Sequence, residues 1–421
     1  MTASAPAFRR CRTALGLRYA LCLAALLAMP LAAPPAAAQR ATLSSHLEQA
    51  LSLDAAYRTL AAQRDAVAAR RALARSPIAG SPSVGGDFRS STRGPREATE
   101  TNLDVAAPVW LPGQRAAYGD TVTAGVADYE ARLQLRRLEV AGLLREAWWS
   151  AASGARDVRV ARDRLATSRD IARDVQRRVD LGDIPFTDAL LVQNETLGAE
   201  LALAQADAAR IAALATYRTL TGGTDPDLPP ERPAARARAH PALLAADAGV
   251  AAAEAQVRLV AATPFDNPEL GVFGRNDSGR LNDQGLSLGL RLRVPLATSA
   301  RNVPRAASAQ ADLTRAVAER ALRRRLLDAE IAAAQQSLRA AEEAARIARR
   351  RLSLANQQLD LARRAFNAGE TGLFELYRIR QLQLEAAGGQ AQAEVNAGRA
   401  RSRLNQSFGA VPGSEEFVSA K

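Results

Sequence analysis

The sequence has few of the residues that build sulfur chemistry or a thick hydrophobic core. Both cysteines, Cys11 and Cys22, lie within the first 38 residues, and only 4% of the chain is aromatic. Residues 39–421 therefore contain no cysteine, which excludes a disulfide, a cysteine metal site and a thiolate nucleophile there. The low aromatic content argues against a large globular core.

Long apolar runs and catalytic motifs are also missing. After residue 38, no run reaches the roughly 20 apolar residues of a membrane-spanning helix, so contact with a membrane would require a barrel. The sequence shows no phosphate-binding glycine loop and no nucleophile elbow. The two histidines, His46 and His240, lack the partners of a metal site, so we expect surface or capping roles. We predict no catalytic residue, no metal ligand and no cofactor, and therefore not an enzyme.

The first 38 residues have the pattern of a secretory signal peptide. Four arginines precede an apolar run at 19–31, and Ala36, Ala37 and Ala38 form a small-residue cleavage site. The mature chain would then begin at Gln39, without a cysteine for a lipid anchor.

The charge is basic but dispersed. The chain has 56 Lys and Arg residues against 44 Asp and Glu residues, a formal net charge of +12, and four of the arginines lie in the predicted signal peptide. The remaining basic residues alternate with acidic ones along helical stretches, whereas a nucleic-acid-binding protein concentrates them on one face. Solvated helix faces and no nucleic-acid partner are expected.

An internal duplication organises the chain. One shift of 187 residues aligns four landmark pairs, which indicates two copies of one unit. The copies occupy 39–223 and 240–410, separated by a proline-rich linker at 224–239 and followed by a tail at 411–421. The aligned pairs are Pro77 with Pro264, Pro108 with Pro295, Gly182 with Gly369, and Gly222 with Gly409.

Each copy has the same predicted order of elements: a helix, a strand hairpin, a very long helix, a glycine turn and a return helix. The long helices carry a heptad seam rich in small residues, which favours close antiparallel packing of neighbouring helices. A continuous long helix would span roughly 100 Å. The predicted ranges are 45–75, 83–110, 111–181 and 185–222 in the first copy, and 241–262, 269–296, 298–368 and 373–409 in the second.

The strand hairpins alternate strictly between apolar and polar residues. From Gly285 to Leu296, leucines alternate with polar residues that include Arg291 and Arg293. This pattern fits either a soluble sheet with one buried face or a membrane barrel whose lumen receives the two arginines. Because closed barrels need at least about eight strands, a chain with four must associate with copies of itself.

The two helix-turn-helix tips, at 177–190 and 364–376, resemble those of the TolC-type outer-membrane efflux proteins, and the resemblance covers essentially the whole mature chain. It implies an α+β membrane protein in which a long antiparallel α-helical coiled-coil barrel continues into a transmembrane β-barrel completed by trimerisation, with four strands per chain. It also implies a periplasmic adaptor and an inner-membrane pump of the RND type as partners.

The resemblance also assigns roles at the tips, which would form the periplasmic end of the duct. Gly182 and Gly369 match the tip glycines of the family and, with Leu181 and Ala368, would dock the adaptor. Asp188 and Glu375 match its acidic aperture residues. Asp183 and Glu370 add charge at the turns, although helix capping alone could explain these two. The positions of a further acidic ring hold Leu191 and Arg378, a departure from the family pattern.

The sequence thus predicts a passive outer-membrane duct, opened when adaptor and pump untwist its tip helices, and heavy-metal cations as cargo because the chain resembles the metal-exporting members that lack a lipid anchor. Two alternatives remain open. One is a drug or small-molecule efflux channel of the same type, and the other is a periplasmic adaptor or coiled-coil scaffold without a barrel.

Overall fold

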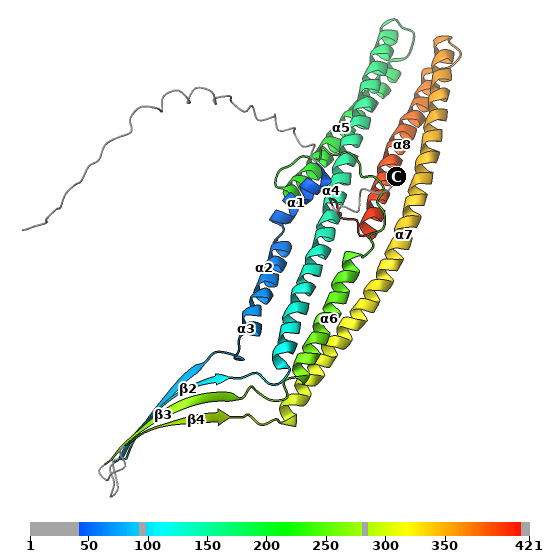
Figure 1. Cartoon of the computed structure of the whole chain (residues 1–421). Coiled ribbons are helices and arrows are strands. Elements are labelled where there is room, and N and C mark those ends of the chain that lie inside the picture. The colour runs from blue at the N-terminus through cyan, green and yellow to red at the C-terminus, as the bar shows by residue number, and fades with distance from the viewer. Residues whose placement is uncertain (1–41, 92–97, 280–284, 414–421) are drawn as a thin grey trace, which may run out of the picture. The chain divides into compact units, whose positions relative to one another are not determined.

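The computed structural model describes residues 42–91, 98–279 and 285–413. The predicted signal peptide at 1–38 lies outside these residues, as do positions 92–97, 280–284 and 414–421. The described elements, shown in Figure 1, are α1 Leu43–Leu53, α2 Ala55–Ala69, α3 Arg71–Arg75, β1 Ser83–Ser91, β2 Ala98–Pro108, α4 Gln114–Asp180, α5 Phe186–Thr221, α6 Pro241–Ala261, β3 Glu269–Gly279, β4 Gly285–Arg293, α7 Ser299–Asn367 and α8 Leu373–Ser407.

The helices pack as two long hairpins with shorter helices beside them. α4 packs against its return helix α5, and α7 packs against its return helix α8. Toward the sheet, α2 and α6 flank α4, and α6 also contacts α7. Toward the tips, α4 contacts α8, which joins the hairpins. Among the described residues, no helix is long and apolar enough to cross a membrane.

The glycine turns of the two predicted copies share one backbone conformation. The glycine turns fall at equivalent places in both copies, with φ angles of 81° at Gly182 and 75° at Gly369, and of 73° at Gly222 and 76° at Gly409. Side chains other than glycine rarely adopt this left-handed region, so the sequence marks these four turns. The fold class expected from the sequence, long antiparallel helices with four strands per chain, is confirmed.

The first helix differs from the expectation. Instead of one helix at 45–75, the chain forms α1, α2 and α3, with breaks at Asp54 and Arg70. At Asp54, the carboxylate accepts a hydrogen bond of 2.6 Å from the backbone N–H of Tyr57 and pairs with Arg136 at 2.8 Å. Asp54 thereby caps α2, and a capping residue requires an extended rather than helical backbone.

The long helix α4 is continuous through its four glycines, Gly119, Gly125, Gly142 and Gly154. It begins at Gln114 rather than at the expected Leu111, because Gly113 precedes it in the left-handed region with a φ of 76°. Seam residues of α4 such as Leu144 and Val175 are buried, and those of α7 are buried or half-buried along its length. The heptad seam therefore marks the packed faces of both long helices.

The four strands form one antiparallel sheet in the order β1-β2-β3-β4. The pairing of β2 with β3 joins the two hairpins, and Val105 lies opposite Val272 in its register. Paired residues of antiparallel strands share a face. One face consequently collects the leucines and valines of all four strands together with Phe88, and the other collects the charged residues together with Phe273.

The linker between the copies is held at the middle of α4. The side chain of Arg145 is 4% exposed and donates hydrogen bonds to both carboxylate oxygens of Glu231 in the linker, at 2.9 to 3.1 Å. Arg145 also donates to the carbonyl oxygen of Ala410, and Ser402 of α8 donates to Glu231 at 2.6 Å. We call these four residues the waist clasp.

Both histidines lie where a return helix ends against the start of another helix. His46 is buried and shares a 2.6 Å hydrogen bond with the hydroxyl of Tyr217 near the end of α5, so the expected surface role is wrong for this residue. His240 is the N-cap of α6, and its Nδ1 accepts a 3.1 Å hydrogen bond from the backbone N–H of Ala242. The capping role holds for His240.

Candidate functional site

Both helical tips end in the same hydrogen-bonded turn. At the first tip, the N–H of Gly182 donates to the carbonyl of Val179 and the N–H of Asp183 donates to Arg178, at 2.9 and 2.8 Å. The second tip repeats this pattern from Gly369 and Glu370. This pair of hydrogen bonds around a left-handed glycine is the Schellman motif, which satisfies the last carbonyl groups of the helix.

The carboxylates of Asp183 and Glu370 do not cap the return helices. Pro185 and Gly372 occupy the N-cap positions, and neither helix has a side-chain cap hydrogen bond. Asp183 and Glu370 are exposed on the turns. Helix capping therefore does not explain these two acids. Their charges face solvent beside the tip glycines.

The two aperture carboxylates have different surroundings. Asp188 and Glu375 both lie in the first turn of their return helices. Arg378 donates to both oxygens of Glu375 at 2.9 and 2.6 Å, and this hydrogen bonding lowers the pKa of Glu375 below its ordinary value. At the first tip, the position equivalent to Arg378 holds the apolar Leu191, three residues after Asp188. Within the described parts of the chain, Asp188 has no ion-pair partner, so its charge is the less compensated of the two.

The structure contains a polar cluster between the hairpins that the sequence did not predict. Glu195 of α5 accepts hydrogen bonds from Arg164 of α4 and from Gln381 of α8, the latter at 2.9 Å. One turn away, Arg380 of α8 donates to the hydroxyl of Thr167 on α4. We call these five residues the inter-hairpin latch, because they tie α8 to the first hairpin. Sequence spacing relates residues within one helix and gives no register between helices.

The tips also meet through one cation–π contact, and they expose apolar side chains. The guanidinium of Arg178 lies 4.4 Å from the ring centroid of Phe366, which joins the end of α4 to the end of α7. Leu181, Phe186 and Phe374 are exposed, Leu181 by 77%. The predicted docking residues Gly182, Ala368 and Gly369 lie on the same exposed turns.

The polar face of the sheet is a network of ion pairs. Arg291 pairs with Asp104 at 3.0 Å, and Arg293 pairs with Glu269 at 3.4 Å, so each predicted lumen arginine has a carboxylate on another strand. Arg275 likewise pairs with Glu100 at 3.2 Å. These contacts were not predicted, because they depend on the strand register.

The apolar face of the sheet is exposed. Among the described residues, no helix packs on the strands in more than isolated contacts. Leu288 is 82% exposed and Val84 is 79% exposed. The other large apolar side chains exposed on this face are Phe88, Leu103, Val105, Leu270, Val272, Leu286, Leu290 and Leu292.

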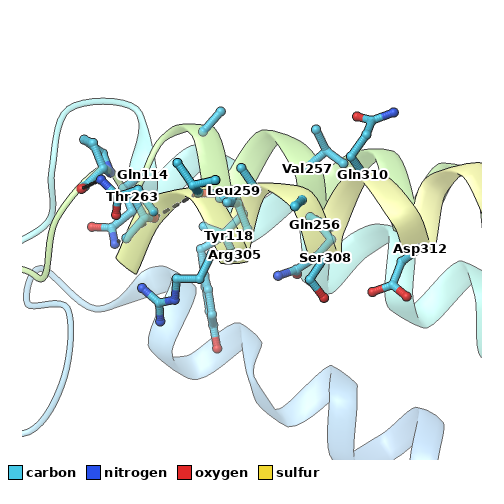
Figure 2. Close-up of a pocket in the computed structure, with 18 of the residues that line it drawn as sticks. Gln114, Tyr118, Gln256, Val257, Leu259, Thr263, Arg305, Ser308, Gln310 and Asp312 are labelled. Carbon is cyan, nitrogen blue, oxygen red and sulfur yellow. Dashed lines mark hydrogen bonds between the residues drawn. The ribbon is translucent and has the colours of Figure 1, made fainter. Parts of the chain in front are cut away.

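A mainly apolar trough of about 1050 Å³ lies where the helices meet the sheet. Figure 2 shows Gln114 and Thr263 near one end and Gln310 and Asp312 near the other, with Tyr118 and Leu259 between them. Among the described residues, no cluster of three or more His, Cys, Asp or Glu side chains could hold a metal ion.

Together, the tips and the two-faced sheet define a class of long helical proteins with a sheet that exposes an apolar surface. No protein-family model matches the chain. The solved outer membrane protein VceC of Vibrio cholerae superposes with a TM-score of 0.71 at 16% identity, covering 87% of this chain and 96% of VceC. The open state of the MtrE outer membrane channel of Neisseria gonorrhoeae superposes with a TM-score of 0.69 at 16% identity, covering 87% and 88%.

A curated relative is similar in sequence. Protein CyaE of Bordetella pertussis is 32% identical over 296 residues, or 65% of this chain and 61% of CyaE, so the chain spans about three fifths of that relative. The structural neighbours are outer-membrane channels and proteins. The chain therefore has the fold of the TolC-type outer-membrane efflux channels, as the sequence resemblance implies.

Proposed function

We propose that the protein is the outer-membrane channel subunit of a tripartite efflux pump, a passive homotrimeric duct with a periplasmic helical part. The observation that carries this proposal is the apolar face of the sheet, which exposes Leu288, Val84 and eight further large side chains. Exposed apolar patches of this extent mark contact with lipid or protein. A soluble scaffold would bury such a face.

The sheet edges support association. β1 and β4 each leave one edge without a strand partner in the four-stranded sheet. Unpaired backbone N–H and C=O groups are not tolerated in lipid, so the edges must pair with other copies. Three copies would supply twelve strands, more than the minimum of about eight for a closed barrel. The ion-paired face would then line a wet lumen.

The test is to purify the mature protein from washed outer membranes and to record currents in planar bilayers. The proposal expects a heat-sensitive trimer that conducts ions. A water-soluble monomer that forms no conductance would instead favour the adaptor or scaffold alternative.

The tip carboxylates are proposed to select cations at the periplasmic aperture. Rings of carboxylates repeated by symmetry attract cations. Because Arg378 compensates Glu375 and no cation of the described chain compensates Asp188, Asp188→Ala should reduce cation preference more than Glu375→Ala. Unchanged reversal potentials in both variants would show that the tip carboxylates do not select cations.

The partners and cargo remain predictions of the family resemblance. A periplasmic adaptor would dock at Leu181, Gly182, Ala368 and Gly369, and an inner-membrane RND-type pump would supply energy. Heavy-metal cations are the proposed cargo, and drugs or other small molecules are the alternative. Deletion of the gene separates these two: sensitivity to zinc, cadmium or copper salts supports the first, and sensitivity to dyes and detergents alone supports the second.

A further inference from the structure

The pairing of β2 with β3 is the junction between the two copies inside one chain. In the closed barrel of the proposed function, β4 of one subunit meets β1 of the next subunit at a second junction. β4 is the counterpart of β2 in the duplication, and β1 is the counterpart of β3. Because strands in a closed barrel follow a fixed stagger, the register of the inner junction predicts the register between subunits.

The aligned prolines establish which residues of β2 and β4 are equivalent. Asp104 lies four residues before Pro108, and Arg291 lies four residues before Pro295. Both side chains lie on the polar face of the sheet, where they pair with each other at 3.0 Å. Arg291 of the second copy is therefore the counterpart of Asp104 in the first.

The hairpin ladders extend this equivalence to β1 and β3. Asp87 of β1 lies opposite Asn102, and Phe273 of β3 lies opposite Gly289. Asn102 and Gly289 each lie six residues before the aligned proline of their copy. Asp87 and Phe273 are consequently counterparts, and both lie on the polar face.

The inner junction places Asp104 opposite Phe273. When each residue is replaced by its counterpart, Arg291 lies opposite Asp87 of the next subunit. A cation and an anion thus face each other at the subunit boundary. Opposite charges in directly facing positions of antiparallel strands stabilise the pairing.

The neighbouring positions in this register fit as well. By the same counting, Arg293 lies opposite Gly85 of the next subunit, and Gly289 lies opposite Arg89 of the next subunit. Glycine has no side chain, so each arginine has room to extend over the facing strand.

The charge pattern by itself selects the same register. A slip of one residue would turn the apolar side chains of one strand to the polar face. A slip of two residues in one direction places Arg89 opposite Arg291, and like charges in facing positions are destabilising. A slip of two in the other direction places Gly289 opposite Asp87, which leaves the carboxylate without a facing cation.

Both side chains are available for a contact between subunits. Asp87 is exposed, its Oδ2 accepts a 3.0 Å hydrogen bond from the amide of Asn102, and it has no ion-pair partner among the described residues. The side chain of Arg291 is 41% exposed, and its pair with Asp104 is made through Nη1. A guanidinium has five N–H donors, so Arg291 can serve a second carboxylate.

We propose that β4 of one subunit pairs with β1 of the next in this register, and that Arg291 forms an ion pair with Asp87 of the next subunit at each boundary. The partner is a second copy of this chain. The inference rests on the proposed function, because it requires a barrel built from several subunits.

Disulfide formation tests the register. Residues 39–421 contain no cysteine, so the pair Asp87→Cys with Arg291→Cys has no competing thiol in the mature chain. Within one chain, β2 and β3 separate these positions by roughly 14 Å, whereas the Cα atoms of a disulfide lie within about 7 Å. The bond can therefore form only between subunits. We expect a covalent trimer on a denaturing gel after oxidation.

Two control pairs report the slipped registers. Arg89→Cys with Arg291→Cys detects a slip of two residues in one direction, and Phe88→Cys with Leu288→Cys detects a slip of two in the other. We expect both controls to remain mainly monomeric on the gel. A test pair that yields no more covalent trimer than the controls would overturn the register.

The temperature at which the trimer dissociates measures the ion pair. Asp87→Asn and Arg291→Gln should each lower this temperature, and the double variant should lower it by less than the two shifts combined. The control cycle combines Arg291→Gln with Asp277→Asn. Asp277 lies on the same face, six residues along β3 from the residue opposite Arg291, so its effect should be additive. Additive shifts in the Asp87 cycle would overturn the ion pair.

Failure of the register and failure of the channel give different results. Covalent trimers from a control pair would overturn the register and leave the trimeric duct intact. A parent protein that is monomeric and conducts no current would overturn both.

Discussion

The indole of Trp149 lies against Gly398 so closely that a Cβ atom on the glycine would stand 2.0 Å from the ring atom Cη2. Trp149 belongs to α4 and Gly398 to α8, so this contact brings the two hairpins together at half height. The adjacent Trp148 packs edge to face on Trp149, with 4.6 Å between ring centroids. The contact explains why α8 needs a glycine at this position.

Gly398→Ala should destabilise the folded protein. The added methyl group forces the indole or the helix to move, and overpacking of this kind costs about 1–3 kcal/mol. Urea unfolding followed by circular dichroism measures the change. Gly198→Ala is the control, because its Cβ atom meets open space and should stabilise the helix. Equal stability of Gly398→Ala and the parent would contradict the close contact.

Loss of one charged partner of the waist clasp should cost more stability than loss of both. Arg145→Met leaves the carboxylate of Glu231 without its buried cation, which costs about 3–5 kcal/mol. Adding Glu231→Gln removes the uncompensated charge and should restore part of the stability. A double-mutant cycle in urea measures this coupling. Strictly additive losses would show that Arg145 and Glu231 stabilise the fold independently.

The stability should fall as the pH drops below about 6.5. Burial lowers the pKa of His46, and burial together with Arg236 and Arg323 lowers the pKa of His240. The unfolded chain, with a histidine pKa of 6.5, therefore binds protons that the folded chain does not. The two neutral histidines therefore contribute fully to the stability of the fold above pH 6.5. This contribution is lost as the pH falls from 6.5 through their lowered pKa values.

Thermal unfolding between about pH 8 and pH 5 measures this dependence. His46→Gln with His240→Gln should flatten the curve over that range, since glutamine does not titrate. A parent protein whose midpoint stays constant between pH 7 and pH 5 would show that neither imidazole is held neutral by the fold.

The two faces of the sheet should respond oppositely to a new charge. Leu288→Arg places a cation on the apolar face, where a lipid-exposed arginine costs about 2–4 kcal/mol near the bilayer centre. Ser287→Arg places the same cation on the polar face, beside the existing ion pairs. We expect the first variant to lose its outer-membrane trimer and the second to keep it. Similar trimer yields from both variants would argue against a lipid-facing surface.

Much of the fold was readable from the sequence because its signals are local. Gly182 and Gly369 mark the tips, since the left-handed turn admits few other residues. The alternation from Gly285 onward separates the two faces of a strand, because successive side chains point to opposite sides. The site was less readable. The capping that could have explained Asp183 and Glu370 is absent, and the pairing of Glu375 with Arg378 reduces the uncompensated negative charge at the second tip.

The sequence by itself determined the periodic features: the duplicated order of elements, the heptad seams, the glycine turns and the alternating strands. Only the tertiary structure decided which helices face each other, where the linker binds, and which charges compensate one another. The break at Asp54 belongs to this second group, because Arg136 lies 82 residues away along the chain. Local periodicity is encoded within a few neighbouring residues, whereas contacts such as Trp149 with Gly398 depend on the register of distant helices.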